Sequence, residues 1–551
     1  MKKILALILA LCMVFALCAC GAEKAEEPAP AATEAPKAEE PKEPVVEEAP
    51  AEPVTLTAWA ALGDKASQVI TSNNEIPVYE KLAEMTGVNV EWTNVSGADV
   101  GTQLNLLVAS QQYPDLIYYS WQTAYAGGLA KAIDDGVAIP LNDLIDEYAP
   151  NLKALFEECP ELKTQLSLDD GTIAMFPSAR TDPRVRIWHG LQVRQDWLDN
   201  LGLEMPETLD EWYNVLKAFK EQDANGNGDP NDEIPFAASA SSSMTSTVLS
   251  FACGVGLVRD AFCVKDGKVV YSPAEPEYKD LIAELAKWYA EGLIDPDFAA
   301  TDGNTLKSLV TTGVAGSYWG SLAGNLGGYN SALQEVVPEG KIVGAPLLKD
   351  ASGVAYTQEA EHAKALTGFG AVITPNCADP VAAVKWLDAH FSEEGKLLME
   401  FGIEGVSYEM VNGEPKFTDE ILNNPDGLTY DIALAKYALK PNTAEVMDDI
   451  YAGYAQYNLQ TEIQKEANAV WAKGDNSRVM PPISLTSEES DEYATIYSEI
   501  QTYVKEMLVK FVMGQVSMDE WDAFVEALNG MDLARAIEIQ QAAYDRYIAR
   551  G

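Results

Sequence analysis

A run of oxygen-bearing side chains occupies residues 223–236, "DANGNGDPNDEIPF". Carboxylate and amide oxygens recur there at every second position, and Ca²⁺ takes six to eight such hard oxygen ligands. The first seven positions follow an EF-hand loop, with a glycine at the sixth, where a sharp turn needs a positive φ. At the twelfth position an EF-hand places a bidentate glutamate, but this chain has Ile234. The residues concerned are Asp223, Asn225, Asn227, Gly228, Asp229, Asn231, Asp232 and Glu233.

The spacing of this loop favours Ca²⁺ over Mg²⁺, because Mg²⁺ prefers few protein ligands and several waters. We expect the ion to be structural, since the loop follows a predicted helix and no catalytic group adjoins it. The competing interpretation is a polar loop of Asx turns that ends the helix. Which of Asn231, Asp232 and Glu233 would ligate is left open by the spacing.

The first residues predict export and a lipid anchor. Lys2 and Lys3 precede an apolar run from Ile4 to Leu17, a stretch of signal-peptide length that is short for a membrane span. "LCAC" then ends at Cys20, the pattern of a bacterial lipobox. We therefore expect a signal peptide over residues 1–19 and a diacylglycerol thioether on Cys20, with acyl chains such as palmitate. A plain signal peptide with incidental cysteines is the alternative.

Residues 22–53 consist almost wholly of Ala, Glu, Pro and Lys. Such a composition cannot bury enough apolar surface to offset the entropy of ordering, so residues 20–53 are predicted to form a disordered, extended tether. The formal net charge of −47 argues against nucleic acid as a partner. None of the cysteines forms a CxxC pair. A bridge between Cys253 and Cys263 is conceivable, but buried free thiols are favoured.

From residue 54 onward, apolar periodicity predicts an α/β domain. "VTLTAWAALG" and residues 88–92 and 116–119 are expected strands with helices between them. Thr208 begins a capping box before a further helix. "AFCVKDGKVVYS" indicates a hairpin. The remaining chain is predicted to be mostly helical, over residues 277–291, 379–390, 393–401, 442–474, 489–513, 517–529 and 532–549.

Several stretches together resemble one family. These are "IPLNDLIDEYAPNLKALFEE", "RQDWLDNLGLEMPETLDEWYNVLKAFK", "DANGNGDPNDEIPF", "LAKWYAEGLIDPDFA" and "VKWLDAHFSEEGKLLMEFGIEGVSYE". The family is that of the extracellular solute-binding lipoproteins of carbohydrate ABC importers. Within it, the branch resembled is the Gram-positive lipoprotein-LplA type together with the alginate-oligosaccharide-binding proteins. The latter close their calcium loop with an adjacent Asp-Glu pair, which Asp232 and Glu233 match one residue later than the shortest version of that pattern.

The resemblance implies a two-lobed, periplasmic-binding-protein-like (type II) α/β fold with a hinge, an interlobe cleft and a helix-rich C-terminal part. One lobe is expected over about 54–180 and 366–421, the other over about 181–365 and 422–551. The implied function is capture of an oligosaccharide and its delivery to the transmembrane subunits of an ABC permease. The protein is expected to be a monomer on the extracellular face of a Gram-positive cell membrane, with structural Ca²⁺.

A sugar presents apolar C–H faces and hydroxyl groups, so its site combines aromatic platforms with convergent polar groups. Aromatic residues at expected strand-to-loop positions are the candidates, although core packing competes for each one. Arginines 180, 184, 186 and 194 are candidates to hold an acidic sugar, but salt bridges across the lobes to the abundant acids are favoured. Trp197, Trp212, Trp288 and Trp386 lie on amphipathic helices and are assigned to the core. The candidate ligand contacts are Trp59, Tyr119, Trp121, Arg186, Trp188, Tyr318 and Trp319.

Two other functions compete with this one. A cell-surface glycoside hydrolase would also use carboxylates and tryptophans, and with 85 acidic residues a suitable pair is always present. A peptide or amino-acid receptor could share the architecture. Other enzyme classes have less support, because the chain has no GxSxG, HExxH or P-loop motif and its three histidines (His189, His362 and His390) are scattered. We therefore expect a receptor with no catalytic residues.

Overall fold

The structure, a computed structural model, describes residues 54–229, 231–240, 247–440 and 446–550. The expected signal peptide, Cys20 and the tether lie outside the described residues, as does Pro230 in the acidic loop. Among the helices of the described residues, none has the length and apolar character that crossing a bilayer requires.

Six of the described strands form a mixed sheet in the order β14-β4-β11-β3-β1-β2. Strand β1 pairs in parallel with β2 and β3, whereas β11 is antiparallel to both β3 and β4. Most of β1 and all of β3 are buried, because helices cover both faces, as the strand–helix alternation predicts. The strands are β1 (Val54–Leu62), β2 (Val88–Ser96), β3 (Leu116–Tyr119), β4 (Phe176–Ala179), β11 (Leu366–Ile373) and β14 (Met447–Asp448).

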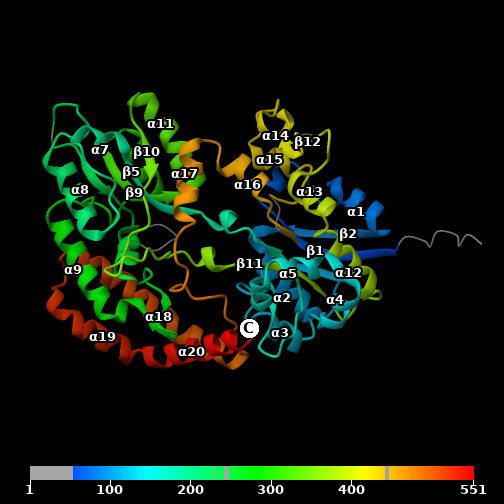
Figure 1. Ribbon diagram of the computed structural model, residues 1–551. Helices are drawn as coiled ribbons and strands as arrows, with labels where there is room; N and C mark the ends of the chain where they lie inside the picture. The colour runs from blue at the N-terminus through cyan, green and yellow to red at the C-terminus, as the bar shows by residue number, and fades with distance from the viewer. Residues whose placement is uncertain (1–53, 230, 241–246, 441–445, 551) are drawn as a thin grey trace, which may run out of the picture. The chain divides into compact units, whose positions relative to one another are not determined.

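The helices of this first lobe come from two separate stretches of the chain, residues 78–166 and 380–434. The hairpin of β12 (Tyr408–Val411) and β13 (Glu414–Phe417) packs beside the helices of the second stretch (Figure 1). The helices are α1 (Val78–Thr86), α2 (Val100–Ser110), α3 (Gly128–Asp134), α4 (Asn142–Tyr148), α5 (Pro150–Glu158), α6 (Pro160–Leu166), α12 (Pro380–Ala389), α13 (Glu393–Phe401), α14 (Asp419–Leu422) and α15 (Tyr430–Leu434).

A second sheet, in the order β10-β5-β9-β6, organises the second lobe. Its strands are β5 (His189–Arg194), β6 (Ile234–Ala237), β9 (Ala315–Ser321) and β10 (Ile342–Gly344), and the predicted hairpin forms as β7 (Phe262–Lys265) and β8 (Lys268–Tyr271). The helices are α7 (Gln195–Leu201), α8 (Leu209–Glu221), α9 (Pro276–Ala290), α10 (Gly303–Thr311), α11 (Gly328–Val336), α16 (Tyr451–Asn458), α17 (Glu462–Trp471), α18 (Ser487–Val512), α19 (Trp521–Gly530) and α20 (Leu533–Ala549).

The described chain passes between the two sheets after β4, again after β10, and a third time after β14. Ala435, Leu439, Val446 and Met447 still pack in the first core, and β14 pairs in parallel with β4. These described residues therefore lie with the first lobe, beyond the limit expected near residue 421. Repeated crossings of this kind are what the two-lobed resemblance implies.

Most predicted helices form within a residue or two of their expected limits. Thr208 makes the predicted capping box. Its hydroxyl accepts from the Glu211 amide, and the Glu211 carboxylate accepts from the Thr208 amide. The single helix predicted over 442–474 is wrong. In the described part of that range, Met447 joins the sheet, and Thr461 caps a new helix, α17, so two shorter helices replace one.

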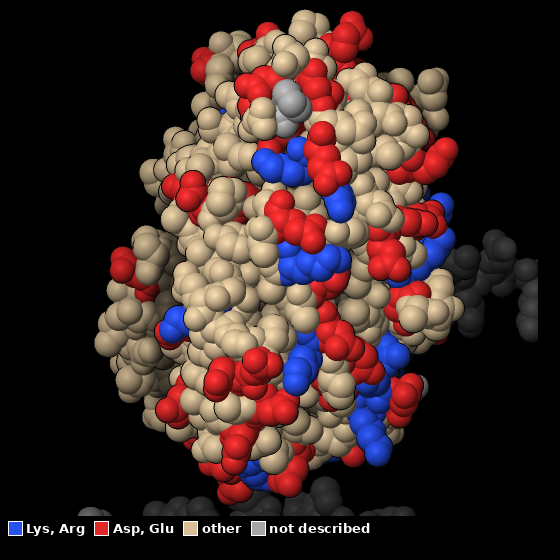
Figure 2. Space-filling view, turned by 90° about the vertical axis from the view of Figure 1, so that its left-hand side faces the viewer, with Lys and Arg blue, Asp and Glu red and all other residues tan. Residues whose placement is uncertain are grey.

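Buried tryptophans and thiols follow the prediction. Trp197, Trp212, Trp288 and Trp386 are fully buried. The cysteines in the described residues, Cys159, Cys253, Cys263 and Cys377, are buried free thiols. On the face drawn in Figure 2, Lys and Arg side chains lie beside Asp and Glu instead of gathering into a basic patch.

Candidate ligand-binding site

A cavity of about 520 Å³ is lined by segments of both lobes and by the third crossing. This volume lies within the range of about 300–1,000 Å³ that small-molecule sites occupy. The first lobe contributes Lys65 after β1, Arg180 after β4, Glu400 at the end of α13, Tyr430 and Asp431 in α15, and Lys440. The second lobe and the crossing contribute Trp188, Ser321, Leu322, Ala323, Asp449, Gly453, Tyr454, Tyr457 and Asn458.

Aromatic rings form much of this cavity's wall. Trp188 meets Tyr454 edge-on, with 6.0 Å between ring centroids. Tyr430 and Tyr457 stack at 4.1 Å and 17°. The Tyr457 hydroxyl donates to Asp431 at 3.1 Å and the Tyr454 hydroxyl donates to the Ile187 carbonyl at 2.5 Å, which fixes both rings. Rigid aromatic surfaces beside polar groups suit a ligand with apolar faces and hydroxyls.

The charged groups of the cavity are paired with one another. Asp449 accepts from Arg180 Nε at 3.1 Å and also contacts Lys440, whose Nζ lies 3.4 Å from Glu400. Lys65 pairs with Asp431. Burial by itself would raise the pKa of Asp449, but the nearby Lys440 and Arg180 outweigh it, so the pKa lies below its usual value.

Glu400 is the exception, because burial raises its pKa to about 7 against the opposing effect of Lys440. The carboxyl group lies against Gly453 of α16, where a side-chain carbon added to the glycine would come 2.3 Å from Glu400 Oε1. A glycine at this position therefore allows α16 to approach α13 closely. The contact keeps Glu400 at the floor of the cavity and out of solvent.

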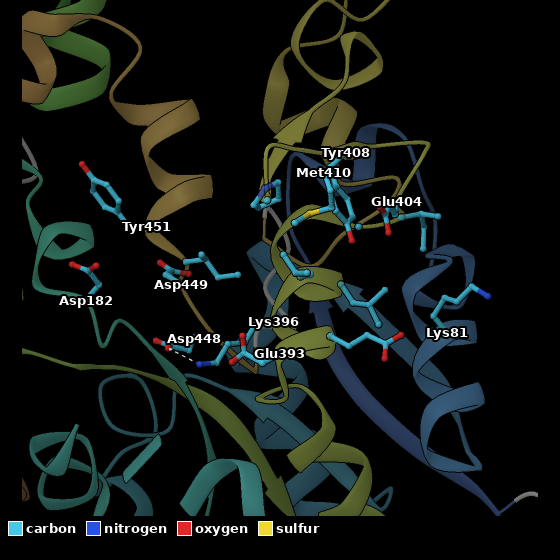
Figure 3. Close-up of a pocket in the computed structure, with 18 of the residues that line it drawn as sticks. Lys81, Asp182, Glu393, Lys396, Glu404, Tyr408, Met410, Asp448, Asp449 and Tyr451 are labelled. Carbon is cyan, nitrogen blue, oxygen red and sulfur yellow. Dashed lines mark ion pairs between the residues drawn. The ribbon is translucent and has the colours of Figure 1, made fainter. Parts of the chain in front are cut away.

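A second cavity, of about 870 Å³, shares Asp449 with the first. Charged groups line much of it: Figure 3 shows Lys396 turned toward Asp448 with Glu393 beside them, and Asp182 and Glu404 at opposite sides of the pocket. Its aromatic residues are Tyr408 and Tyr451, and the guanidinium of Arg184 lies 3.5 Å over the Tyr451 ring, which occupies that face. The first cavity is therefore the better candidate for a sugar.

The acidic loop is held by its own side chains. Asp223 Oδ2 accepts from the Gly228 amide at 2.8 Å, and the side-chain amides of Asn225 and Asn227 donate to Asp232 at 3.0 and 2.7 Å. Gly228 has the expected positive φ, 93°. Among the described residues no group of three or more His, Cys, Asp or Glu side chains is placed to hold a metal. A complete carboxylate cage is thus not preformed.

Two buried oxygens of the loop nevertheless fit a cation. Asp223 Oδ1 and Glu233 Oε2 are buried without a hydrogen-bond partner. Glu233 is 3% exposed, and burial raises the pKa of its carboxyl group. Buried carboxylate oxygens without partners are costly unless a positive charge compensates them. The donor set, carboxylate and amide oxygens, suits Ca²⁺.

A family model described as "Bacterial extracellular solute-binding protein" matches residues 58–397 of the chain, more than half of its length. The chain belongs to this family. The predicted family resemblance and the two-lobed type II fold are therefore confirmed, the latter also by solved structures.

Named relatives of this solute-binding protein cover most of its length. The fructooligosaccharide ABC transporter substrate-binding protein FusA of Streptococcus pneumoniae serotype 4 is 28% identical over 496 residues, 86% of this chain and 88% of FusA. Lipoprotein LipO of Bacillus subtilis is 25% identical over 469 residues, 82% of this chain and 86% of LipO.

Solved structures agree with the fold of this solute-binding protein. FusA in complex with kestose superimposes with a TM-score of 0.63 at 26% identity, covering 90% of this chain and all of FusA's. The alginate-binding protein AlgQ2 without calcium ion gives a TM-score of 0.64 at 25% identity, covering 90% of this chain and 98% of its own.

Of the predicted ligand contacts, Trp188 is the one that lines the cavity. Trp59 lies inside β1, whereas the sequence pattern places it after the strand end, and it is buried. Tyr119 and Trp121 pack edge-on in a cluster with Tyr125. The ligand roles of these three residues stay predictions.

Tyr318 and Trp319 lie within β9 and are buried, not in a strand-to-loop position. Trp319 faces Arg259, whose guanidinium lies 5.3 Å from the ring centroid. Arg259 and His189 both contact Glu359, at 2.8 and 3.0 Å. Burial by itself would raise the pKa of Glu359, but those partners lower it. This network links β5 to the second crossing.

The four arginines all form ion pairs, but those of Arg184 and Arg194 are local and do not cross between the lobes. Their partners are Asp449 for Arg180, Asp182 for Arg184, Glu161 for Arg186 and Asp196 for Arg194. Arg186 is 3% exposed and holds the first crossing through the carbonyls of Arg180 and Thr181.

Sequence reasoning missed most of the cavity. One signal was available: "YAGYAQYN", residues 451–458, repeats tyrosine at every third position. Tyr454 and Tyr457 from that repeat line the cavity, and Tyr451 lines its neighbour. The missed residues are Lys65, Glu400, Tyr430, Asp431, Lys440, Asp449, Tyr454 and Tyr457.

Proposed function

We propose that this protein is a lipid-anchored extracellular receptor that captures an oligosaccharide and delivers it to an ABC permease. The observation that supports it most is the cavity in which Trp188, Tyr454 and the Tyr430–Tyr457 stack meet a set of fixed polar groups. FusA, the relative named for fructooligosaccharide, and the family match support the carbohydrate class.

Capture would proceed by reversible binding. The aromatic faces pack on the apolar C–H surfaces of the sugar, and the side chains of Ser321, Asn458 and the charged pairs exchange hydrogen bonds with its hydroxyls. Because the cavity draws residues from both lobes, a bound sugar bridges them and favours a closed arrangement. That arrangement would be the one that docks on the permease.

The anchor rests on the "LCAC" pattern and on LipO, a relative named as a lipoprotein. Both Cys20 and the tether would place the receptor on the outer face of the cell membrane. We further propose that it acts as a monomer.

Binding of an oligosaccharide is tested by thermal denaturation of the mature protein against a panel of sugars. A ligand that binds the folded state raises the melting temperature by an amount that grows with the ratio of ligand concentration to Kd. We expect at least one oligosaccharide to raise it, with an isothermal titration that saturates. A panel without any shift would contradict the carbohydrate assignment.

A glycoside hydrolase has one observation in its favour, since Glu400 combines a pKa of about 7 with an ionised neighbour, Asp449. Both carboxyl groups, however, are buried and tied to Lys440. A proton donor must reach the glycosidic oxygen, and Glu400 faces Gly453 instead. We therefore propose a binder. Release of new reducing ends from a bound oligosaccharide would overturn that choice.

We also propose structural Ca²⁺ in the acidic loop, held by Asp223, Asn225, Asn227, Asp229, Asp232 and Glu233. The buried, unpartnered oxygens of Asp223 and Glu233 support it. One solved FusA structure is described as that of an EF-hand mutant, which supports a loop of this kind in a relative. The ion would tie the end of α8 to the start of β6.

Removal of the metal tests this proposal. We expect EDTA to lower the melting temperature and Ca²⁺, but not Mg²⁺, to restore it. Glu233→Gln should abolish most of the EDTA effect while being no less stable than the parent in EDTA, because a buried amide costs less than a buried carboxylate. Glu221→Gln, an exposed glutamate at the end of α8, is the control that keeps the effect. A parent protein whose melting temperature does not change in EDTA would contradict the calcium proposal.

A further inference from the structure

We infer that the cavity accepts uncharged oligosaccharides and rejects acidic ones, because its own carboxylates already neutralise every cation among its described lining residues. This inference rests on the proposed function, since it concerns the ligand of the same site. It addresses a real division among the compared proteins: FusA is named for fructooligosaccharide and AlgQ2 for alginate.

The charges of the cavity balance above about pH 7, where Glu400, whose pKa is about 7, is ionised. The cations among the described lining residues are Lys65, Arg180 and Lys440, and the acids are Glu400, Asp431 and Asp449. Each cation has an acid partner: Lys65 pairs with Asp431, and Arg180 and Lys440 share Asp449. Glu400 lies behind this set, 3.4 Å from Lys440.

An acidic sugar would have to compete with these acids. A uronate carboxylate needs a cation, and the available ones are held by Asp431 and Asp449, whose side chains are 13% and 7% exposed. Drawing Arg180 or Lys440 away would leave Asp449 buried with less compensation, which is strongly unfavourable. A carboxylate that left the pairs intact would instead sit beside like charges.

Arg180 is restrained a second time. Its guanidinium lies 5.0 Å from the centroid of the Trp188 ring, while Nε binds Asp449. A carboxylate that met its terminal nitrogens would have to share the guanidinium charge with Asp449, which lies on the same group. Arg186 and Arg194, the most buried of the predicted acid-sugar contacts, are 3% and 2% exposed and are outside this cavity.

A neutral sugar meets none of these costs. Its hydroxyls both donate and accept, so they add to ion pairs without displacing either partner. Its apolar faces suit Trp188 and the Tyr457 side of the tyrosine stack. The chain's net charge of −47 acts in the same direction at longer range, because it lowers the local concentration of anions.

The test compares matched ligands on the full mature protein. Neutral fructo-, gluco-, manno- and galacto-oligosaccharides and acidic oligogalacturonates and alginate oligomers of equal length are titrated calorimetrically at about pH 7.5. We expect at least one neutral compound to bind and every acidic one to bind at least about tenfold more weakly. An acidic oligomer that binds as tightly as the best neutral one overturns the inference but leaves the proposed function standing. Failure of both classes overturns the proposed function and the inference with it.

The variant Asp431→Asn tests whether Asp431 is responsible for the preference for neutral oligomers. It leaves Lys65 without its acid partner, so the preference for neutral over acidic oligomers should fall by about tenfold. Asp426→Asn makes the same change of charge in the neighbouring loop, outside the cavity, and should leave the preference unchanged. Unaltered melting temperatures establish that both variants fold. An unchanged preference in Asp431→Asn would contradict the assigned role.

Discussion

Glu400 carries a proton at a pH where carboxylates are normally ionised. Its pKa is about 7 in the folded protein, because burial disfavours the charge, with Lys440, Asp449 and Tyr430 around it. Its ordinary value is 4.5. The folded state therefore holds one more proton than the unfolded state between these values, so its contribution to stability falls as the pH rises from 4.5 to 7.

Replacing that carboxyl group should change the pH dependence of stability. Glu400→Gln keeps the size of the side chain and removes the charge, so we expect a gain relative to the parent that is small near pH 4.5 and grows to roughly 1–3 kcal/mol above pH 7. Urea unfolding at several pH values measures the difference directly. A difference that stays constant with pH would show that folding does not raise the pKa of Glu400.

At the scale of elements, two glycines let α17 lie flat on the second sheet. A side-chain carbon added at Gly190 of β5 would be 2.2 Å from the Trp471 ring, and one at Gly344 of β10 would be 2.5 Å from Ala467. Trp471 in turn donates through Nε1 to the Ala345 carbonyl at 2.8 Å. This packing positions the helix that follows the third crossing, and with it Tyr454 and Tyr457.

Gly190→Ala should therefore cost stability through overpacking, by about 1–3 kcal/mol in denaturant unfolding. Ligand affinity should fall as well, since only the short connection over residues 459–461 joins α16 to α17. Gly303→Ala is the matched control. Gly303 is the first residue of α10, and no atom lies within 4 Å of a side-chain carbon added there, so this substitution should change stability by less than about 0.5 kcal/mol. Equal effects at both positions would contradict the packing argument.

The same elements show what sequence reasoning can reach. Helices α8, α9, α13 and α20 are predicted closely, because each has a local signal: a cap, an amphipathic stripe or a glycine end. Trp59 and Trp319 are misplaced relative to their strands because a strand buried on both faces carries no alternation that marks its end.

Most residues of the cavity are out of reach of prediction from the sequence for a different reason. Glu400, Tyr430 and Lys440 come from the first lobe, and Asp449 joins them only at the third crossing, beside Met447, which pairs with Ser178 of β4, far away in the sequence. Local periodicity holds no information about such a pairing. Trp188 is within reach because it stands directly before β5 at the first crossing, in the kind of strand-to-loop position expected of a ligand contact.

At the scale of the molecule, each lobe has its own hydrophobic core, and polar contacts join the lobes away from the crossings as well. One such contact lies at the C-terminal helix. Leu533 and Ala536 of α20 pack in the second core, while Arg546 and Arg550 from its last turn pair with Asp169, next to the end of α6 in the first lobe. Arg550 also donates to the Ser167 carbonyl at 2.5 Å, and its side chain is 5% exposed.

Removing Asp169 should weaken this link and the cooperativity of unfolding. Asp169→Ala leaves the nearly buried Arg550 without its carboxylate, whereas Arg546 keeps Glu489 at 2.6 Å, so we expect a loss of about 1–2 kcal/mol. Because the two cores would then be coupled mainly through the crossings, the calorimetric transition should broaden or divide. Asp522→Ala, which breaks an ion pair with Lys279 on the same lobe at an 88% exposed side chain, should leave both the stability and the transition width unchanged. If Asp169→Ala behaves like that control, α20 contributes nothing to the coupling, and the two lobes communicate through the crossings and the bound sugar alone.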